Sequence, residues 1–386
     1  MTRRLLATIA FFLAVSAAAQ TTCLSGSSYG VRDFSPAFDG PIYWPASVRT
    51  GSGSGINPAV ESGTEVPHSK GGDSATITGT TTTDTTATTA PAPQSEYPRS
   101  PKNTLETQIA LARYNISTGS IDGVFGTQTA AALTAFQMSN GLDATGILDA
   151  PTRAALQLDS PPFTTRTITA EDIASIQPLA PTWLGKSQQT TLAYATVLEM
   201  AAEQAHASPA LLRKLNPDVD WKRIKAGATI TVPDVTCTRA ILREGEKAAR
   251  IVIFLNERIL EVFAADGRFL AHFPVSIARD VEKRPVGTLH VKVIAPNPNY
   301  TFDPAVFTES DEGRELGRKL IIPPGPNNPV GLVWIGLDMP GYGIHGTPEP
   351  EKVGRTESHG CFRLANWNAF ALLDMVEVGT EVEVVP

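Results

Sequence analysis

The spacing of apolar residues first becomes regular near residue 101. Leu105 and Ile109 stand at a helical interval, and a second stretch of this kind begins at Thr127. Asp149, followed at once by an alanine and a proline, has the residue types that start a third, short helix. The pattern therefore predicts a compact unit of three helices over residues 101–158.

A second small unit is predicted over residues 188–236. Ser208, followed by a proline, marks the start of a leucine-rich helix, and Asn216, also followed by a proline, marks its end. The stretch AGATITVP then has the alternation of a strand. The unit resembles a lysin-motif (LysM) domain, a βααβ glycan-binding module, but lacks the Gly-Asp-Thr turn typical of that family. A spacer without glycan binding is therefore the alternative.

From Ala248 the pattern becomes that of strands. RIVIFLNERILEVFAADGRFLAHFPVS consists of apolar stretches separated by turn residues, which predicts consecutive hairpins. Further strand signals occur at 287–294, 330–337 and 381–385, and one helix is expected after Asn366 as its cap. The predicted fold class is multidomain α+β, with a mostly β, sandwich-like C-terminal domain over 248–386.

The first twenty residues, MTRRLLATIAFFLAVSAAAQ, run from a basic stretch through an apolar core to small residues. This order is typical of a secretory signal peptide, predicted here as residues 1–19. The apolar run from Leu5 to Val15 is shorter than the about 20 residues that span a bilayer. An exported protein without a transmembrane segment is expected, with an uncleaved anchor as the alternative.

Residues 20–100 are dominated by Gly, Ser, Thr and Pro, as in TITGTTTTDTTATTAPAP. Such a stretch has too little apolar surface to offset the entropy lost on ordering, so a disordered linker is expected. The net charge of −7 and the absence of a Lys/Arg cluster in the sequence argue against nucleic acid as a partner. With Cys23, Cys237 and Cys361, an exported chain has an odd number of cysteines, so at least one thiol is expected to stay unpaired.

The segment HGTPEPEKVGRTESHGC joins Cys361 to two histidines. A cysteine nucleophile reacts as its thiolate, and histidine is the side chain best suited to take its proton near neutral pH. Either His345, sixteen residues upstream, or His359 can serve. Gly360 allows a turn that presents backbone N–H groups for an oxyanion, and Arg363 offers a fork suited to a carboxylate. Together these groups describe acyl transfer.

Two other interpretations apply to the same residues. A lone cysteine is often a small buried apolar residue. Two histidines and a cysteine could also form an incomplete zinc site, but no fourth ligand stands out, and the segment has neither paired cysteines nor a His-Glu-x-x-His spacing.

The motifs resemble two known families. IHGT at 344–347 and SHGCFRL at 358–364, with Asn366, closely resemble the L,D-transpeptidase catalytic domain family, a similarity that extends over 249–386. IDGVFGTQTAAALTAFQ resembles the peptidoglycan-binding three-helix domain family over about 102–157.

The first resemblance implies that Cys361 attacks a peptidoglycan stem peptide, releases D-alanine and forms a thioester that an amine resolves. His345 would be the general base, oriented by the backbone carbonyl of Gly346. Ser358 and His359 would support the loop, the amides of Gly360 and Cys361 would stabilise the oxyanion, and Arg363 with Thr347 would bind the substrate. No metal or cofactor is implied.

The sequence does not identify the acceptor, because attack on the thioester needs the same groups in each case. The candidates are a second stem peptide, a lipoprotein lysine, a D-amino acid and water. A wall hydrolase and a catalytically inert wall-binding protein are therefore alternatives. In each case we expect a protein of the periplasm or cell wall with peptidoglycan peptides and glycan as partners.

Overall fold

The computed structural model describes residues 96–236, 242–305, 310–358 and 360–386. The predicted signal peptide and nearly all of the predicted linker lie outside these ranges, as do Cys23, Cys237 and His359. From Tyr97 on, the described residues belong to one compact unit. None of the helices in the described part of the chain has the length and apolar character needed to cross a bilayer.

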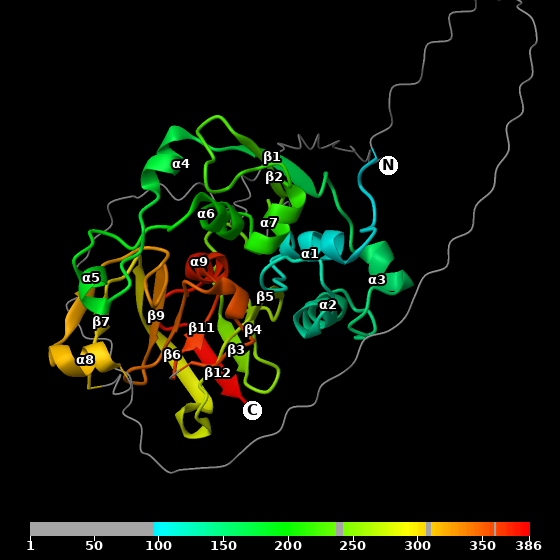
Figure 1. Cartoon of the computed structure of the whole chain (residues 1–386). Coiled ribbons are helices and arrows are strands. Elements are labelled where there is room, and N and C mark those ends of the chain that lie inside the picture. The colour runs from blue at the N-terminus through cyan, green and yellow to red at the C-terminus, as the bar shows by residue number, and fades with distance from the viewer. Residues whose placement is uncertain (1–95, 237–241, 306–309, 359) are drawn as a thin grey trace, which may run out of the picture. The chain divides into compact units, whose positions relative to one another are not determined.

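The first described element group is the predicted set of three helices. They are α1 (Thr104–Ala112), α2 (Thr127–Ser139) and α3 (Ala150–Ala155). Asp149 caps α3 through its carboxylate, which accepts the N–H of Thr152 at 2.9 Å. Figure 1 shows the three helices grouped near the start of the described chain. The helical N-terminal unit is confirmed.

The next elements are β1 (Phe163–Thr167), α4 (Ala170–Ser175), α5 (Trp183–Ser187), α6 (Val197–Gln204), α7 (Pro209–Leu215) and β2 (Thr229–Pro233). β1 pairs with β2 in antiparallel register. The strand that pairs with β2 thus precedes residue 188, where the LysM-like unit was predicted to start, and α4 and α5 lie between β1 and the two predicted helices. From here on, the name LysM-like unit refers to residues 163–233. FTTRT gave no signal because none of its side chains is buried, so the strand lacks the apolar alternation by which strands are recognised.

The two N-terminal units share one hydrophobic core. Ile109 and Phe136 from the three helices lie in the same cluster of buried side chains as Leu212 and Ile230 from the LysM-like unit. The backbones also join directly, since Ile121 donates to the carbonyl of His206 at 2.8 Å. The two units consequently form one packed body and are not independent domains joined by a linker.

The C-terminal domain is mostly β, as predicted. Its strands form one mixed sheet in the order β11-β10-β9-β6-β12-β3-β4-β5. They are β3 (Arg250–Phe254), β4 (Ile259–Phe263), β5 (Phe269–Pro274), β6 (Gly287–Pro296), β9 (Val333–Leu337), β10 (Gly343–His345), β11 (Phe362–Arg363) and β12 (Glu381–Val385). Two short 3₁₀ helices, Val281–Lys283 and Pro350–Lys352, lie in its loops.

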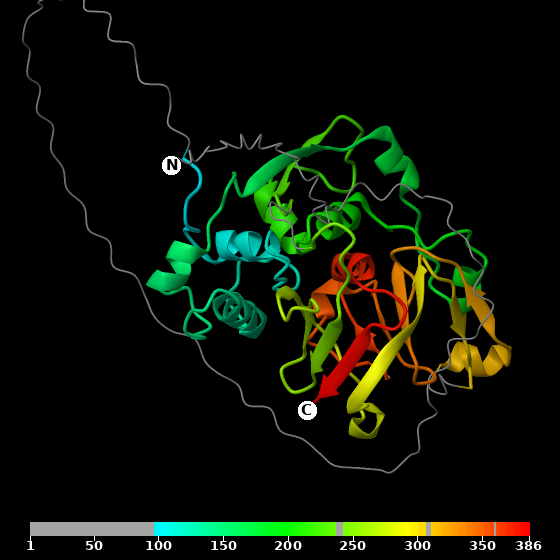
Figure 2. The ribbon, with the colours of Figure 1, turned by 180° about the vertical axis from the view of Figure 1, so that it is seen from behind.

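A single long helix of this domain, α9 (Asn366–Met375), packs against β9 and β10. Figure 2 shows it beside the sheet and near the LysM-like unit. The sequence predicted Asn366 as the cap of this helix, and this prediction is wrong. Ala365 takes the cap position, and Asn366 is the first helical residue, whose side chain bonds to loops of the sheet instead.

The three-helix unit contacts the sheet domain through hydrogen bonds of the loop between α1 and α2. At the sheet edge, Ser117 donates its N–H to the carbonyl of His272 in β5 at 2.8 Å, and His272 donates to Asn115 at 3.1 Å. These bonds use backbone groups that an open edge strand would expose. Asn368 of α9 donates to the Ser117 hydroxyl at 3.0 Å.

A small hairpin lies over one end of the sheet and is held by the LysM-like unit. It consists of β7 (Tyr300–Phe302), α8 (Asp311–Leu316) and β8 (Leu320–Ile322), with β7 paired to β8. Trp183 of α5 stacks on Phe302 with ring centroids 4.3 Å apart. The Glu312 carboxylate accepts the N–H groups of Trp183 and Leu184, each at 2.8 Å.

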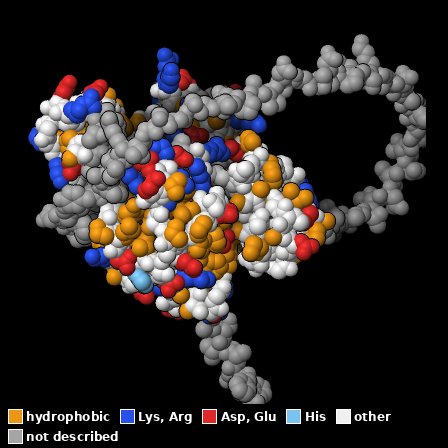
Figure 3. Space-filling model, turned by 90° about the horizontal axis from the view of Figure 1, so that it is seen from below, with side chains coloured by type: hydrophobic (Ala, Val, Ile, Leu, Met, Phe, Trp, Pro, Cys, Tyr) orange, Lys and Arg blue, Asp and Glu red, His pale blue; other side chains and the backbone are white. Residues whose placement is uncertain are grey.

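Surface charge is distributed without one dominant sign. On the face shown in Figure 3, the described Lys and Arg side chains lie among Asp, Glu and apolar side chains.

Leu212→Ala tests whether the shared core behaves as one body. Loss of this fully buried side chain should lower the free energy of unfolding by about 2–5 kcal/mol, since it removes apolar contacts and leaves a cavity. Hydrogen exchange should then show reduced protection in α1 as well as in α7. Reduced protection confined to 163–233 would contradict a common core.

Candidate active site

The pairing of β10 with β11 brings the two motifs together. The strands are parallel, with Ile344 opposite Phe362 and His345 opposite Arg363. Cys361 directly precedes β11 and stands two residues before Arg363. Because alternate residues of extended chain face the same side, the thiol, the imidazole and the guanidinium are directed to one face of the sheet.

The Cys361 thiol is fully buried, with no exposed surface. Its Sγ lies 3.4 Å from the carbonyl of Gly341, to which it donates. Burial raises the pKa of the thiol to about 12, against the smaller opposing effects of the Gly343 N–H and the Arg363 charge. At neutral pH the site as it stands therefore holds a protonated thiol.

The His345 imidazole is also fully buried and has a defined tautomer. Its Nδ1 lies 2.6 Å from the carbonyl oxygen of Gly346, which can only accept, so Nδ1 carries the hydrogen and Nε2 the lone pair. Burial, and secondarily the Arg363 charge, lower the imidazole pKa to about 3. Trp334 stacks beside the ring at 5.7 Å between centroids. The geometry presents a neutral imidazole with Nε2 ready to accept a proton.

Ser358 organises the turn before the thiol. Its hydroxyl donates to the Cys361 carbonyl at 2.6 Å and accepts the N–H of Gly360 at 3.2 Å. The Gly360 amide predicted for the oxyanion is thus engaged within the turn in this structure, and its role in catalysis stays a prediction. Thr347 is buried, and its hydroxyl accepts the N–H of Glu349 at 3.3 Å.

Arg363 carries the positive charge of the site. One terminal nitrogen lies 3.5 Å from the Glu357 carbonyl, and its Nε is buried without a hydrogen bond. Burial lowers the pKa of the guanidinium, and the neighbouring Cys361 and Glu349 oppose this effect. A half-buried guanidinium whose Nε has no hydrogen bond is suited to binding a carboxylate.

Asn366 is a site residue that the sequence placed in the family motif and at a helix cap, without a role in the site. Its Oδ1 accepts the N–H groups of Thr347 and Leu332, each at 3.1 Å. Its Nδ2 donates to Glu203 of α6 at 3.0 Å. The position of Asn366, five residues after Cys361, was the available signal, but its partner Glu203 lies in another unit and could not be found from local pattern.

The hairpin β7-α8-β8 closes the site from solvent. Tyr300, Phe302 and Trp334 lie in one buried cluster with Cys361, together with Leu192 from the LysM-like unit. Leu192 is fixed by backbone bonds, donating to Pro324 at 2.8 Å and accepting from Asn327 at 3.0 Å. Cys361 and His345 have no exposed surface, and the apolar side chains clustered around Cys361 are here called its cover.

Metal-binding chemistry finds no support in the part of the chain that is described. Over those residues, no group of three or more His, Cys, Asp and Glu could hold a metal ion. His359, one of the three residues of the zinc alternative, is not among them.

Comparison with known proteins agrees with the geometry. The family model "L,D-transpeptidase catalytic domain" matches residues 248–384, and "Putative peptidoglycan binding domain" matches residues 100–156. The Bacillus subtilis protein "Putative L,D-transpeptidase YqjB" is 32% identical over 136 residues, which cover 34% of this chain and 68% of that protein. The Escherichia coli protein "Probable L,D-transpeptidase ErfK/SrfK" is 31% identical over 193 residues, 49% of this chain and 59% of that protein.

Among solved structures, an L,D-transpeptidase from Xylanimonas cellulosilytica is 17% identical, with 76% of this chain and 99% of that chain covered and a TM-score of 0.31. A superposition at that score carries no argument. By its sequence matches, the chain belongs to the L,D-transpeptidase family and carries an N-terminal peptidoglycan-binding domain. It is accordingly an enzyme of the transpeptidase class with peptidoglycan as its partner.

Trp183→Ala tests the closure of the site. Loss of the stack on Phe302, worth about 1 kcal/mol, should increase opening of the cover and accelerate alkylation of Cys361 by iodoacetamide several-fold. The rate is measured by mass spectrometry of the peptide that contains Cys361, because Cys23 and Cys237 are further thiols of the chain.

Trp221→Ala is the matched control, because Trp221 is another half-buried tryptophan of the same unit that packs on the helical core. Its alkylation rate should equal that of the wild type. Equal rates in all three proteins would show that the Trp183 stack does not hold the cover.

Proposed function

We propose that the protein forms a thioester between Cys361 and the stem peptide of peptidoglycan and transfers that acyl group to an amine. The observation that carries the proposal is the joining of Cys361, His345 and Arg363 on one face by the parallel pairing of β10 and β11. Arg363 would bind a stem carboxylate and place the scissile carbonyl against Sγ.

The reaction balances with the groups present. Nε2 of His345 takes the thiol proton as Sγ bonds to the carbonyl carbon, giving a tetrahedral oxyanion. Collapse of this intermediate breaks the bond to D-alanine, whose nitrogen receives the proton from His345. An acceptor amine then attacks the thioester, gives its proton to His345 and restores the thiol.

Closure of the site explains how the reactive pair is kept inactive. With the thiol pKa near 12 and the imidazole pKa near 3, transfer of the proton between them is strongly unfavourable in the closed site. Both shifts have burial as their largest cause. Opening to solvent would lower the thiol pKa and raise the imidazole pKa, because water stabilises the charged form of each group.

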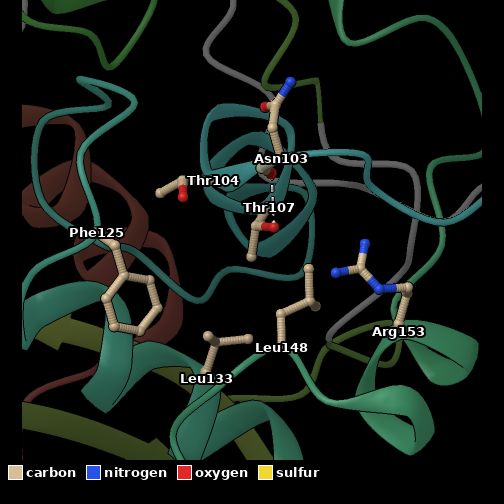
Figure 4. A pocket seen from close by; sticks show the side chains of 7 residues that line it. All are labelled: Asn103, Thr104, Thr107, Phe125, Leu133, Leu148 and Arg153. Carbon is tan, nitrogen blue, oxygen red and sulfur yellow. Dashed lines mark hydrogen bonds between the residues drawn. The ribbon is translucent and has the colours of Figure 1, made fainter. Parts of the chain in front are cut away.

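A cavity of about 280 Å³ in the three-helix unit is the proposed wall-binding site. Figure 4 shows Phe125 on one side of it and Arg153 on the other. Thr107 and Leu148 lie between them. An aromatic ring, an apolar floor and a polar, cationic rim suit a ligand with both apolar and polar groups, such as a segment of wall glycopeptide. Binding there would raise the local concentration of stem peptides.

This set of domains also supports the proposed location. A peptidoglycan-binding domain joined to a catalytic domain of this family is useful only where wall polymer is present. We therefore place the protein outside the cytoplasm, associated with the wall. A wall hydrolase remains the second candidate, because water could attack the same thioester.

Cys361→Ser and His345→Ala test the assigned chemistry. Wild-type protein exposed to a carbapenem should gain a covalent adduct by intact mass, and Cys361→Ser should gain none. His345→Ala should be acylated at least about 100-fold more slowly, as expected when a general base is lost. An adduct of equal size and rate on Cys361→Ser would overturn the assignment.

Incubation with purified wall distinguishes the two reactions. Cross-linked dimers among the muropeptides would identify transfer to an amine, whereas shortened monomers alone would identify hydrolysis.

Phe125→Ala tests the wall-binding cavity. The side chain is 49% exposed, so its loss should leave the fold intact while reducing the amount of protein that sediments with insoluble peptidoglycan. Met138→Ala is the control, since Met138 is an apolar residue of the same unit that is 67% exposed and does not line the cavity. Equal sedimentation of both variants and wild type would contradict the proposed site.

A further inference from the structure

We infer that Glu203 of the LysM-like unit is a positioning residue for His345, acting through Asn366. This assignment rests on the catalytic role proposed for His345. It makes the LysM-like unit a structural part of the active site in addition to any role it has in binding glycan.

The argument begins with the peptide group between Gly346 and Thr347. Its carbonyl oxygen lies 2.6 Å from Nδ1 of His345 and fixes the tautomer of the imidazole. Its N–H, from Thr347, donates to Oδ1 of Asn366 at 3.1 Å. Both ends of one planar group are therefore engaged, and rotation of that group would remove both bonds together.

The glycine makes an external support necessary. Gly346 has no Cβ, and a Cβ built there would collide with Asn366 Oδ1, so only glycine fits. Glycine also restrains the backbone less than any other residue. The orientation of the peptide group consequently depends on the hydrogen bond that the Thr347 N–H donates to Oδ1 of Asn366.

The orientation of the Asn366 amide depends in turn on Glu203. A carboxylate oxygen accepts but does not donate, so Oε1 of Glu203, at 3.0 Å, selects the Nδ2 end of the amide. Oδ1 is then left toward the N–H groups of Thr347 and Leu332. A flipped amide would set donor against donor at these two positions. The other acceptor for Nδ2, the carbonyl of Pro326, is more distant, at 3.3 Å.

Glu203 itself is held for this purpose. It is only 7% exposed, and Oε1 also accepts the hydroxyl of Tyr194 at 2.9 Å. Burial raises its pKa to about 7, with the charge of Glu199 as a smaller contribution and the bonds from Asn366 and Tyr194 in opposition. A protonated carboxyl still has an acceptor oxygen, so Asn366 can be held in either state of Glu203.

Glu199, one turn earlier on α6, is a natural control. Its Oε1 accepts Nδ2 of Asn327 at 2.7 Å, so it also joins α6 to the sheet domain through a carboxylate and an asparagine amide. No described bond connects Asn327 to the Gly346–Thr347 peptide group. Loss of Glu199 should therefore weaken docking of the unit without affecting the imidazole.

The test compares Glu203→Met, Glu203→Gln and Glu199→Met in the full chain. Methionine fills the same volume without an acceptor oxygen, whereas glutamine keeps one. The rate of acylation by a carbapenem, followed by intact mass, should fall on the order of tenfold in Glu203→Met because the base is no longer held in place. Glu203→Gln and Glu199→Met should stay within about threefold of wild type.

Nitrogen NMR of the histidine ring gives a second measurement that a purely structural role would not change. Wild type, Glu203→Gln and Glu199→Met should show His345 with its hydrogen on Nδ1. Glu203→Met and Asn366→Ala should show a mixture of tautomers. When Asn366→Ala is already present, adding Glu203→Met should not change the acylation rate further, because the bond through which Glu203 acts is lost.

The inference is overturned if folded Glu203→Met keeps both the wild-type rate and the wild-type tautomer, or if Glu199→Met has the same defect. Should Glu203→Met fail to fold, Glu203→Ala provides the same comparison. If wild type is not acylated at all, the proposed function fails, and the NMR comparison still decides whether Glu203 positions the ring.

Discussion

The pairing of two very short strands is the contact on which the site depends. β10 and β11 share only two residue pairs, yet they bring a histidine and a cysteine that are sixteen residues apart onto one face of a sheet. So small a ladder has little stability of its own. It is supported by β9 on one side, by α9 on the adjoining face, and by the Arg363 backbone, which exchanges hydrogen bonds with Ser276 at 2.9 Å.

This dependence gives the N-terminal units a structural role in the site. The LysM-like unit reaches the site by two routes. Trp183 and Leu192 hold the cover over Cys361, and Glu203 contacts the amide that bonds to the loop after His345. The three-helix unit contributes through the spacer between the motifs, since Gln128 donates to the Val353 carbonyl at 2.7 Å. Recognition of the wall and chemistry on it thus share one packed body.

Burial has opposite consequences in different parts of the molecule. In the helical core it stabilises the fold through apolar contacts, as for Phe136 and Leu212. Around Cys361 and His345 it favours the uncharged forms of both groups and so opposes the proton transfer that the chemistry needs. The same burial that stabilises the fold thus keeps the thiol and the imidazole of the closed site uncharged.

The sequence by itself determined the three helices, the mostly β catalytic domain and the residue types of the site, because helical period, strand alternation and the HGT and SHGC motifs are local properties. It did not reveal β1, whose side chains are unburied, or the role of Asn366, whose residue type also fits a cap. Only the tertiary structure decided the shared core, the cover over Cys361 and the contact between Glu203 and Asn366. Trp183 and Glu312 are 129 positions apart and Glu203 and Asn366 are 163 apart, and no local pattern records which distant side chain will fill a cavity or complete a hydrogen bond.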